Sequence, residues 1–175
     1  MAAGSRVLDL ACGSGRHLRW LANRGVHVTG VDHDALAVEP LRAQAEIIVA
    51  DIEAEPWPVD GREFDAVIVT NYLWRPLLPR IVASVAPGGL LVYETFARGQ
   101  EILGRPSRPE FLLEPGELIR AAASLHVLAY EDGLLPAPRR RVQRLCAWRG
   151  APGRVDELPL LREAAIHLPL PGDLL

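Results

Sequence analysis

Runs of Val, Ile and Leu alternate along the chain with segments whose apolar residues have helical spacing. The runs predict strands at 7–12, 26–32, 46–51, 64–71, 90–96, 126–132 and 142–149. The segments between them predict helices at 16–25, 34–45 with a break at Pro40, 74–86 ended by the PGG of 87–89, and 115–125. Because the early strands are apolar almost throughout, we expect a parallel sheet covered by helices on both faces.

The last two predicted strands are separated by the turn-rich sequence GLLPAPRRR, which predicts a C-terminal antiparallel hairpin. The whole pattern predicts an α/β fold with a doubly wound, mostly parallel, seven-stranded sheet that ends in this hairpin. We expect one domain over residues 1–149, followed by a Pro-containing tail over 150–175.

Composition narrows the choice of function. Of the 175 residues 49% are hydrophobic, no apolar run reaches the ~18 residues of a membrane span, and the N-terminus shows no signal peptide, so we expect no membrane partner. All 19 basic residues are Arg, which excludes a lysine phosphate loop and lysine catalysis. The net charge of −3 argues against nucleic acid as a partner. The arginine cluster PRRRVQR at 138–144 is either an anion site or a solvated surface.

Cysteine usage points to the cytoplasm. Cys12 and Cys146 lie far apart, and the chain has no CxxC motif and no His cluster. We therefore expect neither a disulfide framework nor a metal site, and a reducing, cytoplasmic location fits.

The sequence DLACGSGRHL at 9–18 is the central chemical signal. Gly13 and Gly15 allow a sharp strand-to-helix turn and a close approach of a ligand to the backbone. Asp32 closes the second strand 17 residues after Gly15 (32 − 15), at a spacing that suits the ribose hydroxyls of a nucleoside. The alternative for Asp32 is an N-cap of the next helix, shared with Asp34.

Further sequence features indicate which nucleoside cofactor the site would bind. Asp51 follows the third strand and can accept from the amino group of adenine while Ile52 packs on the ring; alternatively Asp51 is a loop aspartate that caps nothing. A dinucleotide site usually reads GxGxxG, but Leu18 stands at the third Gly position. Asp9 would repel a pyrophosphate and attract an ammonium or sulfonium group.

The motifs VLDLACGSGRHL, VTGVDHD, VADI and FDAVIVTN, in this order, resemble those of class I S-adenosylmethionine-dependent methyltransferases, and in particular the small bacterial type related to the tellurite-resistance enzymes. The resemblance covers roughly residues 6–149 and implies a Rossmann-like fold with S-adenosylmethionine as cofactor. It implies that the methionine part of the cofactor lies against Asp9, Ala11, Gly13 and Gly15. Ala11 stands where the family often has a third Gly. The resemblance further places Asp32 at the ribose with His33 on the rim, Asp51 and Ile52 at the adenine, and Asn71 near the amino group and the reacting methyl.

The resemblance implies in-line transfer of the methyl group, and we expect a small-molecule acceptor because no Asn-Pro-Pro-Tyr motif follows the fourth strand. The candidate catalytic residues are Asn71, Tyr72 and Glu94. Tyr72 lines the acceptor pocket or packs under the next helix, and Glu94 orients a substrate amine or caps a loop. His17 is a candidate base or a partly exposed helix residue. The segment 97–113 is long for a strand-to-helix connection, and we interpret it as a lid over the acceptor.

Two alternatives remain open at this point: a non-catalytic, S-adenosylmethionine-binding partner subunit, and a nicotinamide-dependent oxidoreductase. Members of the family usually carry a helical segment before the first strand, where this chain has only residues 1–5. We expect the missing cover to come from residues upstream of this sequence, from the amphipathic run ELPLLREAAIHL in the tail, or from a second subunit, which leaves a homodimer open.

Overall fold

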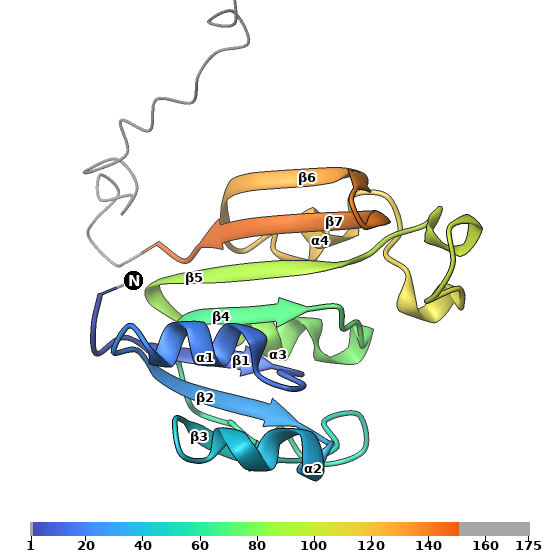
Figure 1. Cartoon of the computed structure of the whole chain (residues 1–175). Coiled ribbons are helices and arrows are strands. Elements are labelled where there is room, and N and C mark those ends of the chain that lie inside the picture. The colour runs from blue at the N-terminus through green and yellow to red at the C-terminus, as the bar shows by residue number, and fades with distance from the viewer. Residues whose placement is uncertain (1, 151–175) are drawn as a thin grey trace, which may run out of the picture.

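The computed structural model describes residues 2–150 (Figure 1), so the tail run ELPLLREAAIHL lies outside the described residues. Seven strands form one sheet in the order β3-β2-β1-β4-β5-β7-β6. The strands β1 to β5 run parallel, and β7 pairs antiparallel with both β5 and β6. The predicted fold class is therefore confirmed. The strand bounds are β1 Arg6–Leu10, β2 His27–Asp32, β3 Glu46–Val49, β4 Phe64–Thr70, β5 Val85–Phe96, β6 His126–Pro136 and β7 Arg139–Trp148.

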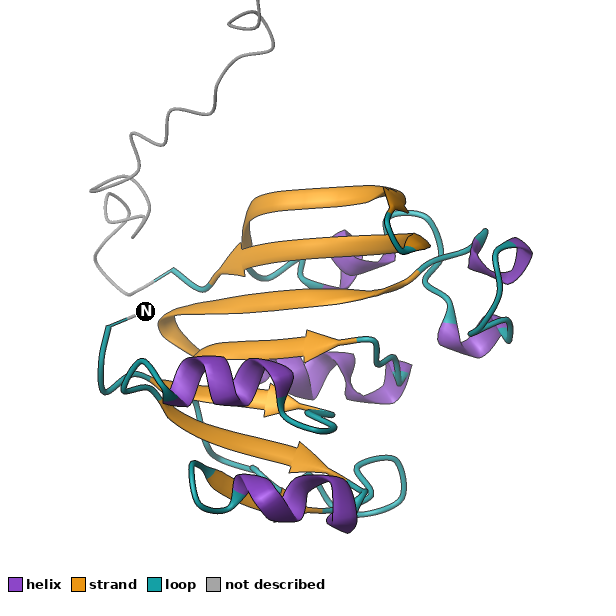
Figure 2. Ribbon diagram, viewed as in Figure 1, coloured by secondary structure: helices purple, strands orange, loops and turns teal. Residues whose placement is uncertain are grey.

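Helices cover both faces of the sheet (Figure 2). On one face, Leu18 and Leu21 of α1 and Val38 of α2 pack against β1, β2 and β4. On the other face, α3 and α4 bury Ile81 and Leu118 against the same sheet. The helix bounds are α1 Arg16–Ala22, α2 Ala35–Val38, α3 Leu78–Ala83 and α4 Glu117–Ala121. Among the described residues, no helix is long and apolar enough to cross a membrane.

The connection from β3 to β4 contains no helix. Residues 50–63, all of them described, form a chain of turns. Trp57 and Val59 fill the core from this loop, with 6% and 1% of their surface exposed, on the face that also holds α3. Two large apolar side chains thus cover β-sheet surface that a helix would otherwise have to bury.

The predicted boundary between the helix at 74–86 and the strand at 90–96 was wrong. The helix predicted at 74–86 ends at Ala83, and β5 begins at Val85, so the PGG sequence lies within β5. A Cβ atom at Gly89 would lie 2.9 Å from two backbone carbonyl oxygens, and only glycine fits this irregular stretch of strand.

The predicted turn at 133–141 is also shorter than expected, because β6 continues to Pro136 and β7 begins at Arg139. Only Ala137 and Pro138 connect the two strands. Pro136 is tolerated because β6 is an edge strand, where a missing N–H leaves no partner unsatisfied. The long hairpin carries arginine side chains out beyond the end of β5.

Candidate active site

Polar side chains gather where the parallel strands end. Asp32 closes β2, Asp51 follows β3, Asn71 follows β4 and Glu94 lies near the end of β5. A cavity of about 220 Å³ opens at this edge, lined by Ala11, Asp32, His33, Ala50, Asp51, Ile52, Glu53 and Tyr72. Five of these eight residues belong to the predicted cofactor site, four of them to its nucleoside part, so the structure brings together positions that are far apart in sequence.

The loop between β1 and α1 turns through left-handed backbone conformations. Ala11, Gly13 and Gly15 have φ angles of 53°, 52° and 77°. A Cβ atom on Gly15 would lie 2.6 Å from the side chain of Leu41, whereas one on Gly13 would meet no atom within 4 Å. Gly15 therefore packs the loop against the domain, and Gly13 borders open space that a ligand can occupy.

Replacing Ala11 with glycine is expected to stabilise the protein. A left-handed conformation costs a non-glycine residue roughly 1–2 kcal/mol, and the added freedom of glycine in the unfolded chain offsets roughly 0.5–1 kcal/mol of that gain. We therefore expect Ala11→Gly to raise the free energy of unfolding by about 0.5 kcal/mol, measured by urea denaturation. Ala22→Gly within α1 is the matched control and is expected to lower it. A loss of stability in both variants would contradict the strain at Ala11.

Asp9, which precedes this loop on β1, is buried, and one of its carboxylate oxygens has no hydrogen-bond donor among the described residues. Only 1% of its surface is exposed, and Oδ2 has no hydrogen-bond partner among the described residues. Burial raises the pKa of Asp9 to about 7, and it outweighs the opposing effects of the Leu18 backbone amide and Arg16. A buried acceptor without a donor is unfavourable, so this oxygen can accept a hydrogen bond from a donor that the described residues do not supply. The ammonium group of an amino acid is such a donor.

Asp32 connects the glycine loop to the cavity. Its Oδ2 accepts a hydrogen bond from Gly13 N at 2.7 Å, and its Oδ1 accepts from Asp34 N at 3.0 Å. Asp34 itself caps α2 by accepting from the amides of Leu36 and Ala37, each at 3.1 Å. Asp32 is therefore not the helix cap, and each of its oxygens keeps a lone pair for a ligand. The neighbouring His33 side chain is 81% exposed, on the rim.

The adenine candidates lie at the other end of the cavity. Asp51 is exposed, and its Oδ1 accepts from Glu53 N at 3.0 Å, while Ile52 is buried. Asp51 thus does cap a turn, and its second oxygen faces no hydrogen-bond donor among the described residues. Tyr72 lines the same cavity, and burial together with the Glu53 carboxylate raises the pKa of its phenol. The structure therefore groups Tyr72 with the nucleoside residues, whereas Glu94 lines a second cavity to which Tyr72 contributes no lining.

Asn71 and Glu94 are joined through the backbone. Asn71 has a left-handed φ of 55°, and its N–H donates to the carbonyl of Glu94 at 2.9 Å. The Glu94 carboxylate makes ion pairs with Arg144 Nε at 2.6 Å and Arg140 Nη2 at 3.5 Å. Glu94 therefore does not cap a loop through its side chain. We did not predict Arg140 and Arg144 as site residues, although both belong to the arginine cluster visible in the sequence.

His17 lies in the first turn of α1, and burial and Arg16 lower its pKa while Glu94 opposes the shift. The imidazole is therefore neutral over most of the physiological range.

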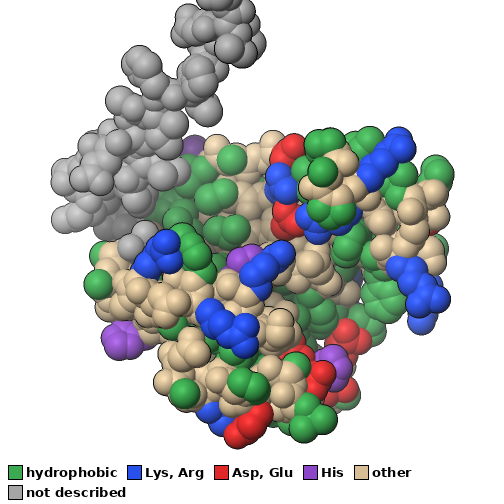
Figure 3. Space-filling view, viewed as in Figure 1, with side chains coloured by type: hydrophobic (Ala, Val, Ile, Leu, Met, Phe, Trp, Pro, Cys, Tyr) green, Lys and Arg blue, Asp and Glu red, His purple; other side chains and the backbone are tan. Residues whose placement is uncertain are grey.

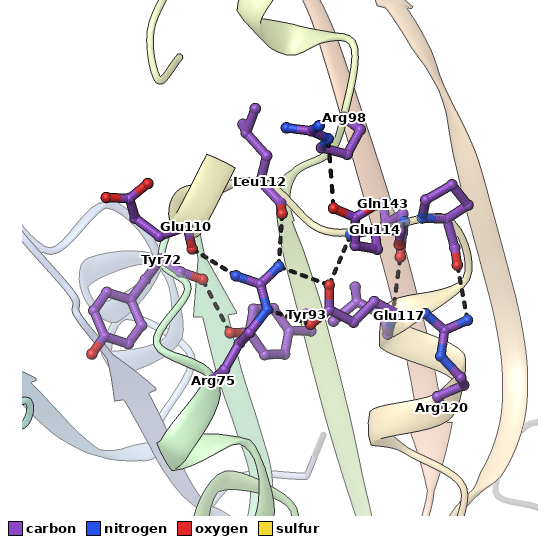
Figure 4. Close-up of polar contacts among 12 residues, drawn as sticks. Tyr72, Arg75, Tyr93, Arg98, Glu110, Leu112, Glu114, Glu117, Arg120 and Gln143 are labelled. Atoms are coloured by element: carbon purple, nitrogen blue, oxygen red, sulfur yellow. Dashed lines mark hydrogen bonds and ion pairs between the residues drawn. The ribbon is translucent and has the colours of Figure 1, made fainter. Parts of the chain in front are cut away.

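The predicted lid over 97–113 has a fixed base and an exposed tip. The base is closed by hydrogen bonds from Leu113 N to Phe96 O at 2.9 Å and from Arg98 N to Leu113 O at 3.0 Å. Arg75 fastens it further, donating to the carbonyls of Glu110 and Leu112, each at 2.8 Å, and to the Glu117 carboxylate at 2.7 and 2.9 Å (Figure 4). The tip projects beyond the strand ends, and Ile102 on it is 85% exposed (Figure 1).

Cutting this tip is expected to leave the cofactor site intact. The protease Glu-C cleaves after glutamate, and Glu101 is an exposed glutamate at the tip. Because the base is hydrogen-bonded independently of the tip, we expect the nicked protein to keep its affinity for S-adenosylhomocysteine, measured by calorimetry, and to lose methyl transfer. A parallel loss of S-adenosylhomocysteine affinity would contradict a lid that serves only the acceptor.

The comparisons with known proteins agree with this geometry. Residues 7–89 match the family model described as a methyltransferase domain. The chain is 36% identical over 156 residues to a trans-aconitate 2-methyltransferase of Paracidovorax citrulli, covering 79% of this chain and 59% of that protein. It is 44% identical over 100 residues to a ribosomal protein L11 methyltransferase of Dechloromonas aromatica, covering 54% and 33%. The chain thus spans about three fifths of the length of the first relative.

The fold has solved counterparts. A TehB-like S-adenosylmethionine-dependent methyltransferase from Corynebacterium glutamicum superimposes with a TM-score of 0.64 at 17% identity, covering 85% of this chain and 82% of that one. The orphaned Asp9 oxygen and the open space at Gly13 fit the cofactor of that family. From its motifs, strand order and relatives, the chain belongs to the class I S-adenosylmethionine-dependent methyltransferases, with the fold of the TehB-like members.

Proposed function

We propose that this chain binds S-adenosylmethionine along the carboxyl edge of its sheet and transfers the methyl group to a small-molecule acceptor. The observation that carries the proposal is Asp9, a buried carboxylate whose Oδ2 lacks a donor among the described residues, together with the open space at Gly13 in the loop that follows its strand. An amino acid ammonium group placed there would satisfy the oxygen and hold the carboxylate in its charged form. We propose one domain over 1–149, acting in the cytoplasm.

Each part of the cofactor has a candidate partner in the chain. Asp9 would take the ammonium group, with the backbone of Gly13 and Gly15 alongside the methionine part. Asp32 would accept from both ribose hydroxyls, one on each oxygen. Asp51 would accept from the adenine amino group, with Ile52 packed on the ring. Asn71, held to Glu94 by its backbone, would lie nearest to the reacting methyl.

The cofactor supplies an activated methyl carbon on a sulfonium leaving group. The residues of the chain have to align the acceptor with the methyl carbon and exclude water, and orientation of this kind can provide roughly 7–11 kcal/mol. Glu94 is engaged by two arginines, so it would have to give up an ion pair to accept a proton. A nucleophile that arrives already ionised fits such a site, because it needs no base.

A small acceptor is supported by the net charge of −3 and by the relative named for trans-aconitate. The relative named for a ribosomal protein matches over a shorter part of this chain. We propose no nucleic acid and no membrane partner, and we leave the homodimer as a proposal for sedimentation analysis.

Two measurements test the proposal and separate it from the alternatives. Calorimetry is expected to show binding of S-adenosylhomocysteine and much weaker binding of NAD. Transfer from radiolabelled S-adenosylmethionine is then measured against carboxylic acids, amines and thiols. Binding without any transfer would favour the non-catalytic partner subunit, and NAD affinity equal to that of S-adenosylhomocysteine would favour an oxidoreductase.

A further inference from the structure

Two arginines lie beside the proposed methyl-transfer site on the last strand. Arg140 and Arg144 are four residues apart on β7, so their side chains leave the same face of the strand. Arg144 lies directly opposite Glu94 of β5 and Glu131 of β6. Figure 3 shows arginine and carboxylate side chains gathered over β6 and β7 on the side that carries α1.

The two guanidinium groups differ in how many carboxylate partners they have. Arg144 pairs with Glu94 at 2.6 Å and with Glu131 at 3.3 Å. For Arg140, the 3.5 Å ion pair with Glu94 is the only polar contact to the described residues, although its side chain is 77% buried (23% exposed). Its Nε is buried without a hydrogen-bond partner in the described part of the chain. A guanidinium presents five donors in a planar fork, so the contact with Glu94 leaves Arg140 donors, Nε among them, without an acceptor among the described residues.

The position of this arginine pair connects it to the reaction. Glu94 lies near the carboxyl end of β5, and its carbonyl accepts the N–H of Asn71, the residue proposed to lie nearest the methyl group. A shallow cavity of about 310 Å³ begins at Glu94, Glu131 and Arg144 and continues over the apolar side chains of Val92, Ala129 and Cys146. Its charged end holds Arg144, which can receive an anion, and its apolar floor can receive a carbon skeleton. Arg140 is not among the lining residues and adjoins this end through its ion pair with Glu94.

We propose that the methyl acceptor is a carboxylic acid and that Arg140, supported by Arg144, binds one of its carboxylates. Glu94 holds the two guanidinium groups in place and gives way, at least in part, to the carboxylate of the acceptor. This inference rests on the proposed function and names the acceptor class for the same site. A planar carboxylate matches the fork of Arg140 through two parallel hydrogen bonds, the strongest common form of this contact.

The chemistry balances without a base. A carboxylate oxygen forms the new bond to the methyl carbon while the carbon–sulfur bond breaks and its electron pair goes to sulfur. The products are a methyl ester and S-adenosylhomocysteine, and no proton is released. Because carboxylic acids are ionised at pH 7, the acceptor arrives as the nucleophile, which agrees with the engagement of Glu94 in ion pairs.

Binding of a defined probe tests the inference. The probe is tricarballylate, titrated into the complex of the protein with S-adenosylhomocysteine at low ionic strength, and its triamide is the neutral control. We expect the wild-type complex to bind tricarballylate and not the triamide. Arg140→Met is expected to weaken the binding at least roughly tenfold, Arg140→Lys to weaken it less, and Glu94→Gln to strengthen it, since a competing charge is removed.

Arg139→Met is the matched control, because Arg139 precedes Arg140 on β7, points to the opposite face and is exposed. It changes the net charge equally and is expected to leave tricarballylate binding unaltered. Unchanged affinity for S-adenosylhomocysteine in every variant shows that each is folded. The inference is overturned if the complex does not bind tricarballylate, if Arg139→Met and Arg140→Met have equal effects, or if Glu94→Gln weakens binding. Failure of the protein to bind S-adenosylhomocysteine at all would instead overturn the proposed function.

Discussion

Asp9→Asn is expected to raise the free energy of unfolding by about 4 kcal/mol at pH 8 and by almost nothing at pH 4. The pKa of Asp9 is raised from 3.8 to about 7 in the folded protein, chiefly by burial. The folded state therefore holds the proton more tightly than the unfolded state. The stabilisation from this proton is complete below pH 3.8 and is lost as the pH rises towards 7. Asparagine stays neutral, so the variant avoids this loss.

Urea unfolding of wild type and variant at pH 4, 6 and 8 measures the effect, and the difference between the two proteins isolates Asp9 from other titrating groups. Asp60→Asn, at an exposed position in the loop between β3 and β4, is the control and is expected to change stability little. We also expect Asp9→Asn to weaken binding of S-adenosylhomocysteine, because the charge that meets the ammonium group is lost. A stability gain that does not depend on pH would show that Asp9 is not buried in charged form at pH 8.

Asp32→Ala is expected to weaken S-adenosylhomocysteine binding roughly 100-fold or more, since the variant loses two hydrogen bonds to a charged acceptor, each worth roughly 1.5–3 kcal/mol. The variant also loses the bond from Gly13 N that shapes the loop. Asp51→Ala is expected to weaken binding only about tenfold, because Asp51 is exposed and would accept one bond from the ligand.

Calorimetry on the three proteins decides the order of these effects. Asp34→Ala is the matched control, because it removes a neighbouring carboxylate that caps α2. Its expected result is a loss of about 1 kcal/mol in stability with unchanged affinity for S-adenosylhomocysteine. If Asp32→Ala and Asp51→Ala cause equal losses, the ribose does not lie at Asp32.

The sheet could be predicted because the apolar composition of its strands indicates that both of its faces are buried. The residues of β1, β2 and β4 are mostly apolar, β2 ends at Asp32, and Asn71 follows β4. Parallel strands of this kind have to lie inside a doubly covered sheet, which places Asp32, Asp51 and Asn71 on one edge. The nucleoside half of the candidate site follows from that geometry alone.

The part of the candidate site that would bind the methyl acceptor could not be predicted from the local sequence pattern, because it depends on pairing between distant segments. Proline and arginine in GLLPAPRRR favour a turn, yet the edge position of β6 lets both strands continue through them. That extension brings Arg140 to Glu94 of β5, about 50 residues earlier in the chain, next to Arg144, which lies within the predicted strand. In the same way, Val85 joins β5 through its pairing with Phe64 of β4, which places the start of β5 ahead of the PGG sequence.

The strand order also constrains how the chain assembles during synthesis. β7 is the last of the described strands to leave the ribosome, yet it lies between β5 and β6. Until residues 139–148 have emerged, β5 has a partner on one side only, and the backbone groups along its other side remain open to any passing strand. β6 cannot cover that side, because its hydrogen bonds run to β7 alone. The sheet is therefore closed by insertion of a completed hairpin, and the nascent protein is most exposed to misassembly just before its last described strand is made.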